Sequence, residues 1–290
     1  MEFVQVHEVG PRDGLQNEAG VISVDRKVAL VRALVDAGFR RIEVGSFVSP
    51  KWVPQMADTD RVMAALSAVP GVRYDVLVPN MRGWDGFLAA PRLGDYGVAV
   101  FISASEGFSR ANLNCTIAES VARLAPVVQA AAALAVPVRG YVSCVSDCPF
   151  DGPVAPAAVA QAVALLRAVA PMPVSLGDTL GRATPARIAA MLAAVAEVAP
   201  VAELAGHYHD TSGRALENVA VSLEMGLRAF DSAAGGLGGC PYAPGAPGNL
   251  ASEALVPFLH DNGYKTGVDA TKLAEAAALA KEIRNGNTAH

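Results

Sequence analysis

The stretch DRKVALVRALVDAGFRRIEVGS, residues 25–46, contains the pattern that decides the fold. Residues 25–37 place apolar side chains at helical spacing, with Ser23 at an N-cap position and Gly38 where the helix would end. The following RIEVGS, residues 41–46, begins with alternating polar and apolar residues, which is typical of a strand. The stretch therefore predicts a helix followed by a strand, the repeating unit of a parallel sheet.

The same unit recurs along most of the chain. Strands are predicted at residues 3–9, 41–46, 73–78, 97–102, 138–144, 174–176, 204–209 and 229–232. Helices are predicted between them, among others at residues 25–37, 118–134, 155–168, 185–198 and 213–225. Eight alternating units in 290 residues predict an α/β fold of the (β/α)₈ TIM-barrel type.

An open doubly wound sheet is the alternative architecture, but it usually has fewer strands, and no Gly-x-Gly-x-x-Gly follows the first strand. No Ser/Gly-rich linker or charge block divides the units, so we expect residues 1–290 to be a single TIM-barrel catalytic domain. The barrel is expected at residues 3–236. A flap and C-terminal helices are expected at residues 237–283, with the helices at 251–259 and 270–283.

The composition restricts the partners and the location of the protein. With 52% hydrophobic and 18% charged residues, the chain can bury a sizeable core. The net charge of -5 argues against nucleic acid and against an anionic membrane surface as a main partner. No apolar run reaches the about 18 residues of a spanning helix, and the chain does not open on a targeting segment. These features predict a cytoplasmic protein.

Four cysteines in a chain of this length do not indicate a disulfide framework. Cys144 and Cys148 lie four residues apart, but no second Cys/His pair with zinc-finger spacing accompanies them. A structural zinc site is therefore the less favoured interpretation. Buried free thiols are the better interpretation for Cys115, Cys144 and Cys148.

Candidate metal ligands follow two of the predicted strands, at the end of the barrel where active sites lie. His207 and His209 are two residues apart on one strand, so both side chains point to the same face and can share a cation. Asp13, after the first strand, adds the oxygen ligand that Mg²⁺ or Mn²⁺ prefers. The alternative interpretation is that these three residues bind no metal and are ordinary polar residues at the solvated rim of the barrel.

Three further charged residues lie near predicted strand ends. Arg12 is suited either to an ion pair with Glu43 or to a bidentate grip on a carboxylate or enolate oxygen. Asp178 is also compatible with a simple helix cap. The strand residue His7 is more often a packing residue than a catalytic one.

The segment around Cys240 carries a reactive group on a glycine-rich loop. Gly235, Gly236, Gly238 and Gly239 lose backbone entropy on ordering, which a purely structural loop would tend to avoid, so the run suits a flap that closes over a substrate. The thiol of Cys240 is open to three roles: nucleophile, redox sensor or general acid/base. A nucleophile needs a partner base, and the histidines are assigned to the metal, so general acid/base chemistry is favoured.

At these residues the chain resembles a known family, the hydroxymethylglutaryl-CoA lyases. The resemblance rests on GPRDGLQNE (10–18), SFVSPKWVPQM (46–56), RGYVSC (139–144), SLGDT (175–179) and GLGGCPYAPGAPGN (236–249). It extends over almost the whole chain. The Arg-Asp and His-x-His features are shared with a wider superfamily of barrel metalloenzymes that includes Claisen-condensing synthases, whereas SFVSPKWVPQM and GLGGCPY are typical of the lyases.

The resemblance implies a role for each matching residue. It implies four ligands for one divalent cation, Mg²⁺ or Mn²⁺: Asp13, His207, His209 and Asn249. Four catalytic residues are implied: Arg12 on the substrate oxygens, Glu43 and Asp178 orienting Arg12 and taking part in proton transfer, and Cys240 as the catalytic thiol. Besides Arg12, three residues are implied in substrate binding, the last two toward coenzyme A: Gln16, Arg110 and Asn112.

The resemblance also implies an activity and a partner. The expected reaction is retro-Claisen cleavage of 3-hydroxy-3-methylglutaryl-CoA, an acyl-CoA, to acetyl-CoA and acetoacetate, by a homodimer. Arg182, Ser212 and Arg214 depart from the usual family pattern near strand ends, so the same chemistry on a different 3-hydroxy-3-substituted acyl-CoA stays open. The pathway, leucine degradation or that of another branched acid, stays open too. A non-catalytic barrel scaffold is the alternative outside enzymes.

Overall fold

Eight parallel strands form the centre of the computed structural model, which describes all residues except 19, 239–247 and 287–290. The strands are β1 (Gln5–Glu8), β2 (Arg41–Ser46), β3 (Arg73–Leu77), β4 (Asp95–Ser103), β5 (Val138–Ser143), β8 (Val174–Asp178), β9 (Leu204–Tyr208) and β10 (Ala229–Ser232). They pair in the order β1-β10-β9-β8-β5-β4-β3-β2, and β2 pairs with β1, so the sheet closes. The predicted (β/α)₈ barrel is confirmed.

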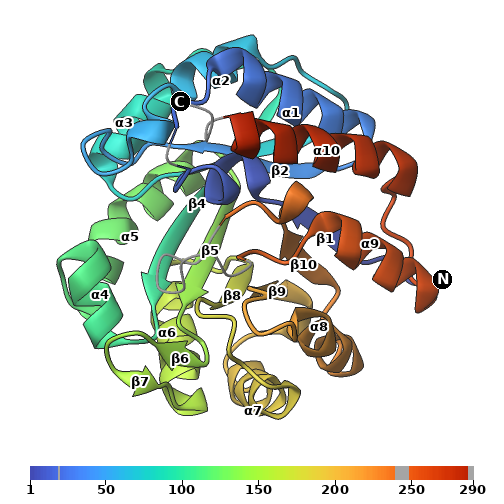
Figure 1. Cartoon of the computed structure of the whole chain (residues 1–290). Coiled ribbons are helices and arrows are strands. Elements are labelled where there is room, and N and C mark those ends of the chain that lie inside the picture. The colour runs from blue at the N-terminus through green and yellow to red at the C-terminus, as the bar shows by residue number, and fades with distance from the viewer. Residues whose placement is uncertain (19, 239–247, 287–290) are drawn as a thin grey trace.

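Helices surround the barrel (Figure 1). They are α1 (Val24–Asp36), α2 (Thr59–Ala65), α3 (Met81–Ala89), α4 (Glu106–Leu113), α5 (Ile117–Ala133), α6 (Pro156–Val169), α7 (Pro185–Ala196) and α8 (Ala215–Glu224), followed by α9 (Ser252–Asp261) and α10 (Ala270–Gly286). The latter two coincide with the expected C-terminal helices. The remaining elements are the π-helix η1 (Gly10–Gly14), the 3₁₀ turns η2 (Pro54–Met56), η3 (Val201–Glu203) and η4 (Ala234–Gly236), and the hairpin β6 (Asp147–Cys148) with β7 (Gly152–Pro153).

The first helix shows why the sequence produces these boundaries. The Ser23 side chain accepts a hydrogen bond from the Arg26 N–H, so it caps the first turn of α1 as its position predicts. After the helix, Gly38 has φ +106°, and a Cβ there would lie 2.3 Å from the Gly267 carbonyl oxygen. Only glycine fits this turn, which leads the chain from α1 into β2.

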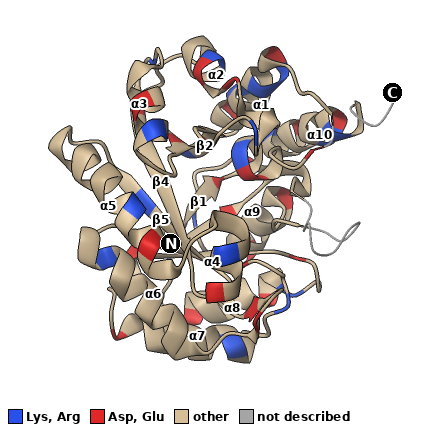
Figure 2. Ribbon diagram, turned by 90° about the vertical axis from the view of Figure 1, so that its left-hand side faces the viewer, with Lys and Arg blue, Asp and Glu red and all other residues tan. Residues whose placement is uncertain are grey.

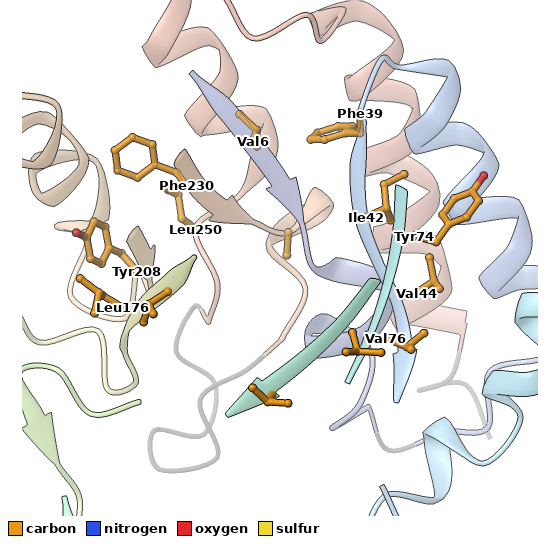
Figure 3. Packing of buried hydrophobic residues seen from close by; sticks show 14 of the residues in the cluster. Val6, Phe39, Ile42, Val44, Tyr74, Val76, Leu176, Tyr208, Phe230 and Leu250 are labelled. Atoms are coloured by element: carbon orange, nitrogen blue, oxygen red, sulfur yellow. The ribbon is translucent and has the colours of Figure 1, made fainter. Parts of the chain in front are cut away.

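Apolar side chains fill the space between the barrel and its helices. Tyr74, Tyr208, Phe39 and Phe230 are among the largest fully buried side chains, and Figure 3 shows them on the strands or directly beside them. The same continuous cluster includes buried residues of α9 and α10. Each such side chain stabilises the fold by about 1.5–3 kcal/mol through burial. The C-terminal helices therefore belong to the same core as the barrel.

Charged side chains lie mostly on the outer helices. In the view of Figure 2, Lys and Arg are interspersed with Asp and Glu over these helices. Within the part of the chain that the structure describes, no helix combines the length and the apolar character that crossing a bilayer requires. Inside the barrel, by contrast, charged residues meet one another near the C-terminal ends of the strands, and this cluster forms the candidate site.

Candidate active site at the C-terminal end of the barrel

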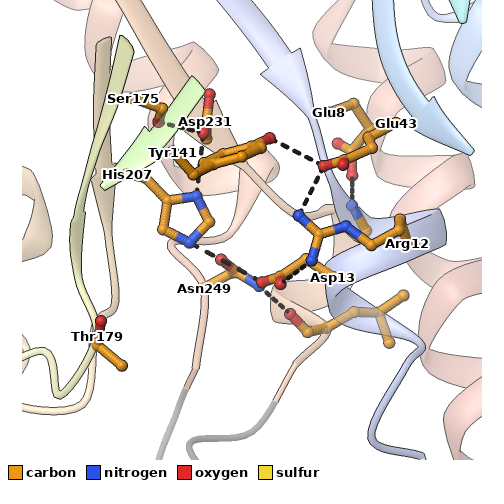
Figure 4. A network of polar contacts seen from close by, with 12 residues as sticks. Glu8, Arg12, Asp13, Glu43, Tyr141, Ser175, Thr179, His207, Asp231 and Asn249 are labelled. Atoms are coloured by element: carbon orange, nitrogen blue, oxygen red, sulfur yellow. Dashed lines mark hydrogen bonds and ion pairs between the residues drawn. The ribbon is translucent and has the colours of Figure 1, made fainter. Parts of the chain in front are cut away.

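The π-helix η1 carries two of the predicted site residues. The N–H groups of Arg12, Asp13 and Gly14 all donate to the Val9 carbonyl oxygen, at 3.1, 2.8 and 3.2 Å, which winds the chain tightly after β1. A Cβ at Gly10 would lie 2.6 Å from Glu8 Oε1, so this winding needs glycine at its start. π-turns of this kind are frequent at functional sites. Here the turn directs Arg12 and Asp13 toward the strand ends (Figure 4).

Asp13, His207 and His209 come together as the His-x-His spacing predicts. One ligand atom from each lies within 4.8 Å of the other two. The centroids of the His207 and His209 rings are 5.5 Å apart, and His207 Nε2 lies 3.9 Å from Asp13 Oδ2. Among the described residues this is the group of histidine, cysteine and carboxylate side chains that fits a metal ion.

The charge states of two of these residues, His209 and Asp13, suit a cation. Burial lowers the pKa of His209 to about 4, with a further lowering by the neighbouring His207, so the ring is neutral at neutral pH. Burial alone would raise the pKa of Asp13, but the charges of Arg12, His207 and His209 outweigh it and lower this pKa to about 2. Together they offer a carboxylate and a neutral imidazole, both of which are good ligands.

Arg12 is fixed between two carboxylates. Its Nη1 lies 2.6 Å from Asp13 Oδ1 and its Nη2 lies 2.8 Å from Glu43 Oε2. Burial opposes the charge, yet Glu43 and Asp13 raise the Arg12 pKa above its ordinary value. Tyr141 donates from its hydroxyl to Glu43 Oε2 at 2.9 Å, and its ring centroid lies 5.6 Å from Arg12 Cζ. The ion pair between Arg12 and Glu43, one of the two sequence-based alternatives, is present.

Polar atoms without partners mark the space that a ligand would fill. Arg12 Nε and Glu43 Oε1 are buried and have no hydrogen-bond partner. Leaving a buried polar group unpaired costs about 1–3 kcal/mol, more for a charged group. Two such atoms beside the candidate ligands fit a site that binds a cation and a polar substrate. The donor set therefore fits the divalent metal that the sequence predicts.

Comparison with known proteins gives the family. The model of the HMGL-like family matches residues 3–280. The chain belongs to the HMGL-like family. It is 52% identical over 275 residues to the hydroxymethylglutaryl-CoA lyase of Pseudomonas mevalonii, a match that covers 95% of this chain and 90% of the relative. The resemblance in the sequence is thereby confirmed.

Solved structures of HMGL-like proteins share the fold. The HMG-CoA lyase of Brucella melitensis has a TM-score of 0.95 and 55% identity, covering 98% of this chain and 100% of that one. An HMG-CoA lyase of Acinetobacter baumannii, solved in complex with coenzyme A and 3-methylmalate, has a TM-score of 0.88 and 33% identity, covering 98% of this chain and 92% of that one.

Asn249 lies beside the three candidate ligands of this HMGL-like chain. Its side chain is buried, and Nδ2 donates to Asp13 Oδ2 at 2.9 Å and to the Leu237 carbonyl oxygen at 3.2 Å. Its backbone forms a bridge with that of His209. The fourth predicted ligand is thus held next to the triad by both its side chain and its backbone.

Asp178 bonds to the loops around it. Its carboxylate accepts from Ser146 Oγ at 2.6 Å and from the Ala183 N–H at 2.9 Å, so it fixes the loop after β8. Within the described residues Asp178 has no hydrogen bond or ion pair with Arg12, so its role in orienting Arg12 and in proton transfer stays a prediction.

The other predicted site residues have varied positions. Gln16 is half-buried directly after η1, where its N–H donates to the Arg12 carbonyl oxygen at 3.0 Å. Arg110 and Asn112 are exposed on α4, and Arg110 Nε lies 3.7 Å from Glu106 Oε2. Cys240 lies outside the described residues. The substrate-binding roles of the first three stay predictions.

The thiols and the departures from the family pattern also have defined places. Cys115, Cys144 and Cys148 are free and buried, which confirms the interpretation of the thiols.

Arg182, Ser212 and Arg214, which depart from the family pattern, are all exposed in the loops after β8 and β9. These two loops pair, because the Ser212 N–H donates to the Gly181 carbonyl oxygen at 3.2 Å. The departures therefore lie together at the rim of the barrel.

Sequence reasoning missed the polar residues deeper in the barrel. Arg139, Tyr141, Ser175 and Asp231 are buried there and bond to one another and to site residues. The spacing of Arg139 and Tyr141 carries a signal, since residues two apart on a strand share a face. A buried arginine or aspartate on a strand is unusual unless it is paired. Finding the partners, however, requires the barrel.

Proposed function

We propose that this chain cleaves 3-hydroxy-3-methylglutaryl-CoA to acetyl-CoA and acetoacetate, as an HMGL-like lyase. The observation that carries the proposal is the buried Arg12 beside the triad of Asp13, His207 and His209, with unpaired polar atoms around them. The Pseudomonas mevalonii relative is named for this activity. The Acinetobacter baumannii structure contains coenzyme A and a hydroxylated dicarboxylic acid, 3-methylmalate, which supports an acyl-CoA with an acidic acyl group as the substrate.

Asp13, His207, His209 and Asn249 would hold the divalent cation. Their oxygen and nitrogen atoms suit both Mg²⁺ and Mn²⁺, which we propose as alternatives. When bound, such an ion acts as a Lewis acid that stabilises negative charge on substrate oxygens. The low pKa of Asp13 keeps its carboxylate ionised and ready to bind down to acidic pH.

Arg12 is proposed to stabilise the charge that develops during cleavage. The proton on the C3 hydroxyl is removed, the C2–C3 bond breaks, and its electron pair passes to the thioester as an enolate, which leaves acetoacetate. A guanidinium held by Asp13 and Glu43 needs no reorganisation to interact with the enolate oxygen. Tyr141 supports the arrangement, because its hydroxyl donates to Glu43.

Two proton transfers complete the proposed reaction. Burial raises the pKa of Asp178, which makes this carboxylate a stronger base than an exposed aspartate, and Ser146 and the Ala183 N–H keep it in place. We assign to Asp178 the removal of the hydroxyl proton. Protonation of the enolate carbon to give acetyl-CoA is assigned to the thiol of Cys240, a residue outside the described part of the chain.

A coupled assay of acetyl-CoA release tests the proposed function. We expect turnover of 3-hydroxy-3-methylglutaryl-CoA that a chelator abolishes and that added Mg²⁺ or Mn²⁺ restores. A panel of thioesters with longer 3-substituents in the same assay tests the acyl group. Absence of release from every member of the panel, with metal present, would reject the lyase proposal, whereas preference for a longer member would change only the substrate.

We also propose a homodimer and one catalytic domain over residues 1–290. A single apolar cluster that joins the barrel strands to α9 and α10 supports the single domain. The dimer rests on the family resemblance. Light scattering coupled to size-exclusion chromatography tests it, with a mass of one chain, 29.8 kDa, as the contradicting result.

A further inference from the structure

Asp231 lies directly behind one of the candidate metal ligands. This residue of β10 is buried, and its Oδ2 lies 3.0 Å from Nδ1 of His207 on the neighbouring strand β9. Register places the two side by side, since the backbones of Asp231 and His207 pair in the sheet. The bond involves the ring nitrogen that is farther from Asp13, because Nε2 faces Asp13 at 3.9 Å.

Two other side chains fix the carboxylate of Asp231. Ser175 Oγ, from β8, donates to Oδ2 at 2.7 Å, and the guanidinium of Arg139, from β5, forms an ion pair with Oδ1. Against the cost of burial, the charges of Arg139 and His207 lower the Asp231 pKa. The carboxylate is therefore ionised and accepts from partners on three different strands, which leaves it one orientation toward His207.

The same contacts continue around the barrel to Arg12. Arg139 Nη1 donates to the Tyr141 hydroxyl at 2.9 Å, and that hydroxyl donates to Glu43 Oε2 at 2.9 Å. Glu43 then pairs with Arg12. Figure 4 shows Tyr141 between the Asp231 side and the Arg12 side of this network. One continuous set of buried polar contacts thus supports both His207 and Arg12.

We propose that Asp231 is a positioning residue for the cation site: it holds the His207 proton on Nδ1, so that the lone pair of Nε2 faces the cation. The inference rests on the proposed function, because it assumes that His207 is a ligand. Carboxylates in this position behind a metal-binding histidine fix the ring orientation and raise its basicity as a ligand. Arg139 and Ser175 act one step further out, by orienting Asp231.

A purely structural role for Asp231 is the competing explanation. Its ion pair with Arg139 crosses the barrel from β10 to β5, and breaking a buried pair costs about 3–5 kcal/mol in stability. Both explanations predict a less stable variant. Only the positioning role predicts that replacing Asp231 also changes the tautomer of His207 and the affinity for the metal.

The first test compares Mn²⁺ binding by the metal-free full-length chain and its variants, by calorimetry or by the electron paramagnetic resonance of free Mn²⁺. We expect Asp231→Asn to weaken binding about 10–100-fold, the usual effect of removing such a partner. Asp75→Asn is the matched control, because Asp75 is also a buried carboxylate paired with an arginine, Arg73, with Nε 3.4 Å from Oδ1. It should bind Mn²⁺ like the wild type.

The second test observes the tautomer of His207 by ¹⁵N–¹H correlation spectroscopy of the metal-free protein, on the alkaline side of the ring's own titration, which the same spectra follow. The wild type should carry the proton on Nδ1, and Asp231→Asn should shift the population toward Nε2. If this variant does not fold, Asp231→Asn combined with Arg139→Gln removes both charges of the pair and serves in its place.

The outcomes separate the two proposals. Wild-type Mn²⁺ affinity and an unchanged tautomer in the Asp231 variant would overturn the positioning role, while the lyase proposal stands. A wild-type chain that binds no Mn²⁺ and shows no metal-dependent turnover would remove the proposed function and this inference with it. Weaker binding in both Asp231→Asn and Asp75→Asn would indicate general destabilisation and would also count against the positioning role.

Discussion

Arg12 is the residue whose surroundings most directly indicate a catalytic role. The guanidinium is buried and paired with Asp13 and Glu43. Because well-packed apolar side chains often give a fold as much stability as a buried ion pair, stability alone does not explain this arrangement. Its Nε is buried and has no partner, so the group retains hydrogen-bonding capacity that the fold does not use. A substrate oxygen would use this capacity.

We expect Arg12→Gln to lower kcat by about 100–1000-fold, because the variant loses the fixed charge that stabilises the enolate, an effect of about 3–4 kcal/mol. Steady-state kinetics with 3-hydroxy-3-methylglutaryl-CoA measures it, and Mn²⁺ content should stay near that of the wild type. Arg26→Gln is the control, because Arg26 pairs with Glu282 on the exposed surface. Near-normal turnover by Arg12→Gln would remove Arg12 from the proposed mechanism.

Tyr141 allows a test of the buried network without a change of charge. In Tyr141→Phe, Glu43 Oε2 loses one donor and Arg139 Nη1 loses its acceptor. An unsatisfied buried group costs about 1–3 kcal/mol, so the free energy of unfolding should fall by about this amount. Equilibrium denaturation in urea measures the change. A fall of less than about 0.5 kcal/mol would mean that water replaces the hydroxyl in the network.

At the scale of elements, Glu8 joins three segments near the site. Its buried carboxylate accepts from the N–H of Gly10 at the start of η1, from the N–H of Ala234 in η4, and from Ser252 Oγ at the start of α9. Burial, opposed by these bonds, raises the Glu8 pKa from 4.5 to about 7. The start of η1, the turn η4 and the start of α9 are therefore hydrogen-bonded to a carboxyl group whose pKa lies near neutral pH.

This raised pKa predicts a pH-dependent stability. Between about pH 4.5 and 7 the folded chain binds the Glu8 proton more tightly than the unfolded chain, so folding is favoured at low pH and this contribution is lost as pH rises. The free energy of unfolding of the wild type, relative to Glu8→Gln, should therefore fall by up to about 3 kcal/mol from about pH 5 to about pH 8. Urea denaturation of both proteins at the two pH values measures the change. A constant difference between the proteins would contradict it.

At the scale of elements, the sequence predicts those helices and strands whose apolar side chains repeat with a clear period. The eight strands, α1 and the helices from α5 to α10 were all predictable, because apolar spacing and caps are local properties. The helices α2, α3 and α4 have seven to nine residues, which is too short for a clear helical period, and the β6–β7 hairpin has strands of two residues. The π-turn of η1 depends on three N–H groups sharing the Val9 carbonyl oxygen, which no spacing rule predicts.

In the candidate site, the sequence does not predict contacts between residues that lie far apart along the chain. Asp13, His207 and His209 were predictable, since strand ends of a barrel converge and the histidines lie two residues apart. The partner of Arg139 was not, because Asp231 is 92 residues away and only barrel closure brings β5 and β10 to face each other. The role of Asp178 toward Arg12 came from the resemblance; of the partners that the structure shows, Ala183 is a local one five residues away, whereas Ser146 is 32 residues away and could not be chosen without the fold.

At the scale of the whole molecule, the last helix covers the first. In Figure 1, α10 lies beside α1, and a Cβ added at Gly235 in η4 would lie 3.1 Å from the Ala277 carbonyl oxygen and the Ala280 Cβ of α10. Gly235 has φ +72°, so this turn needs glycine for both its conformation and its space. The C-terminal helix therefore supports the barrel and the turn next to the site together.

This arrangement predicts that a substitution in α10, far from the chemistry, acts on global stability. Leu273 is fully buried within the main apolar cluster, so Leu273→Ala should lower the free energy of unfolding by about 2–5 kcal/mol through lost burial and a cavity. Glu275→Ala, two residues along on the exposed side, should change it by less than about 0.5 kcal/mol. Below the unfolding transition kcat should stay unchanged in both, because neither side chain belongs to the buried network of the site. A stable Leu273→Ala variant would mean that α10 is only loosely attached, and a selective loss of kcat would mean that it holds the site directly.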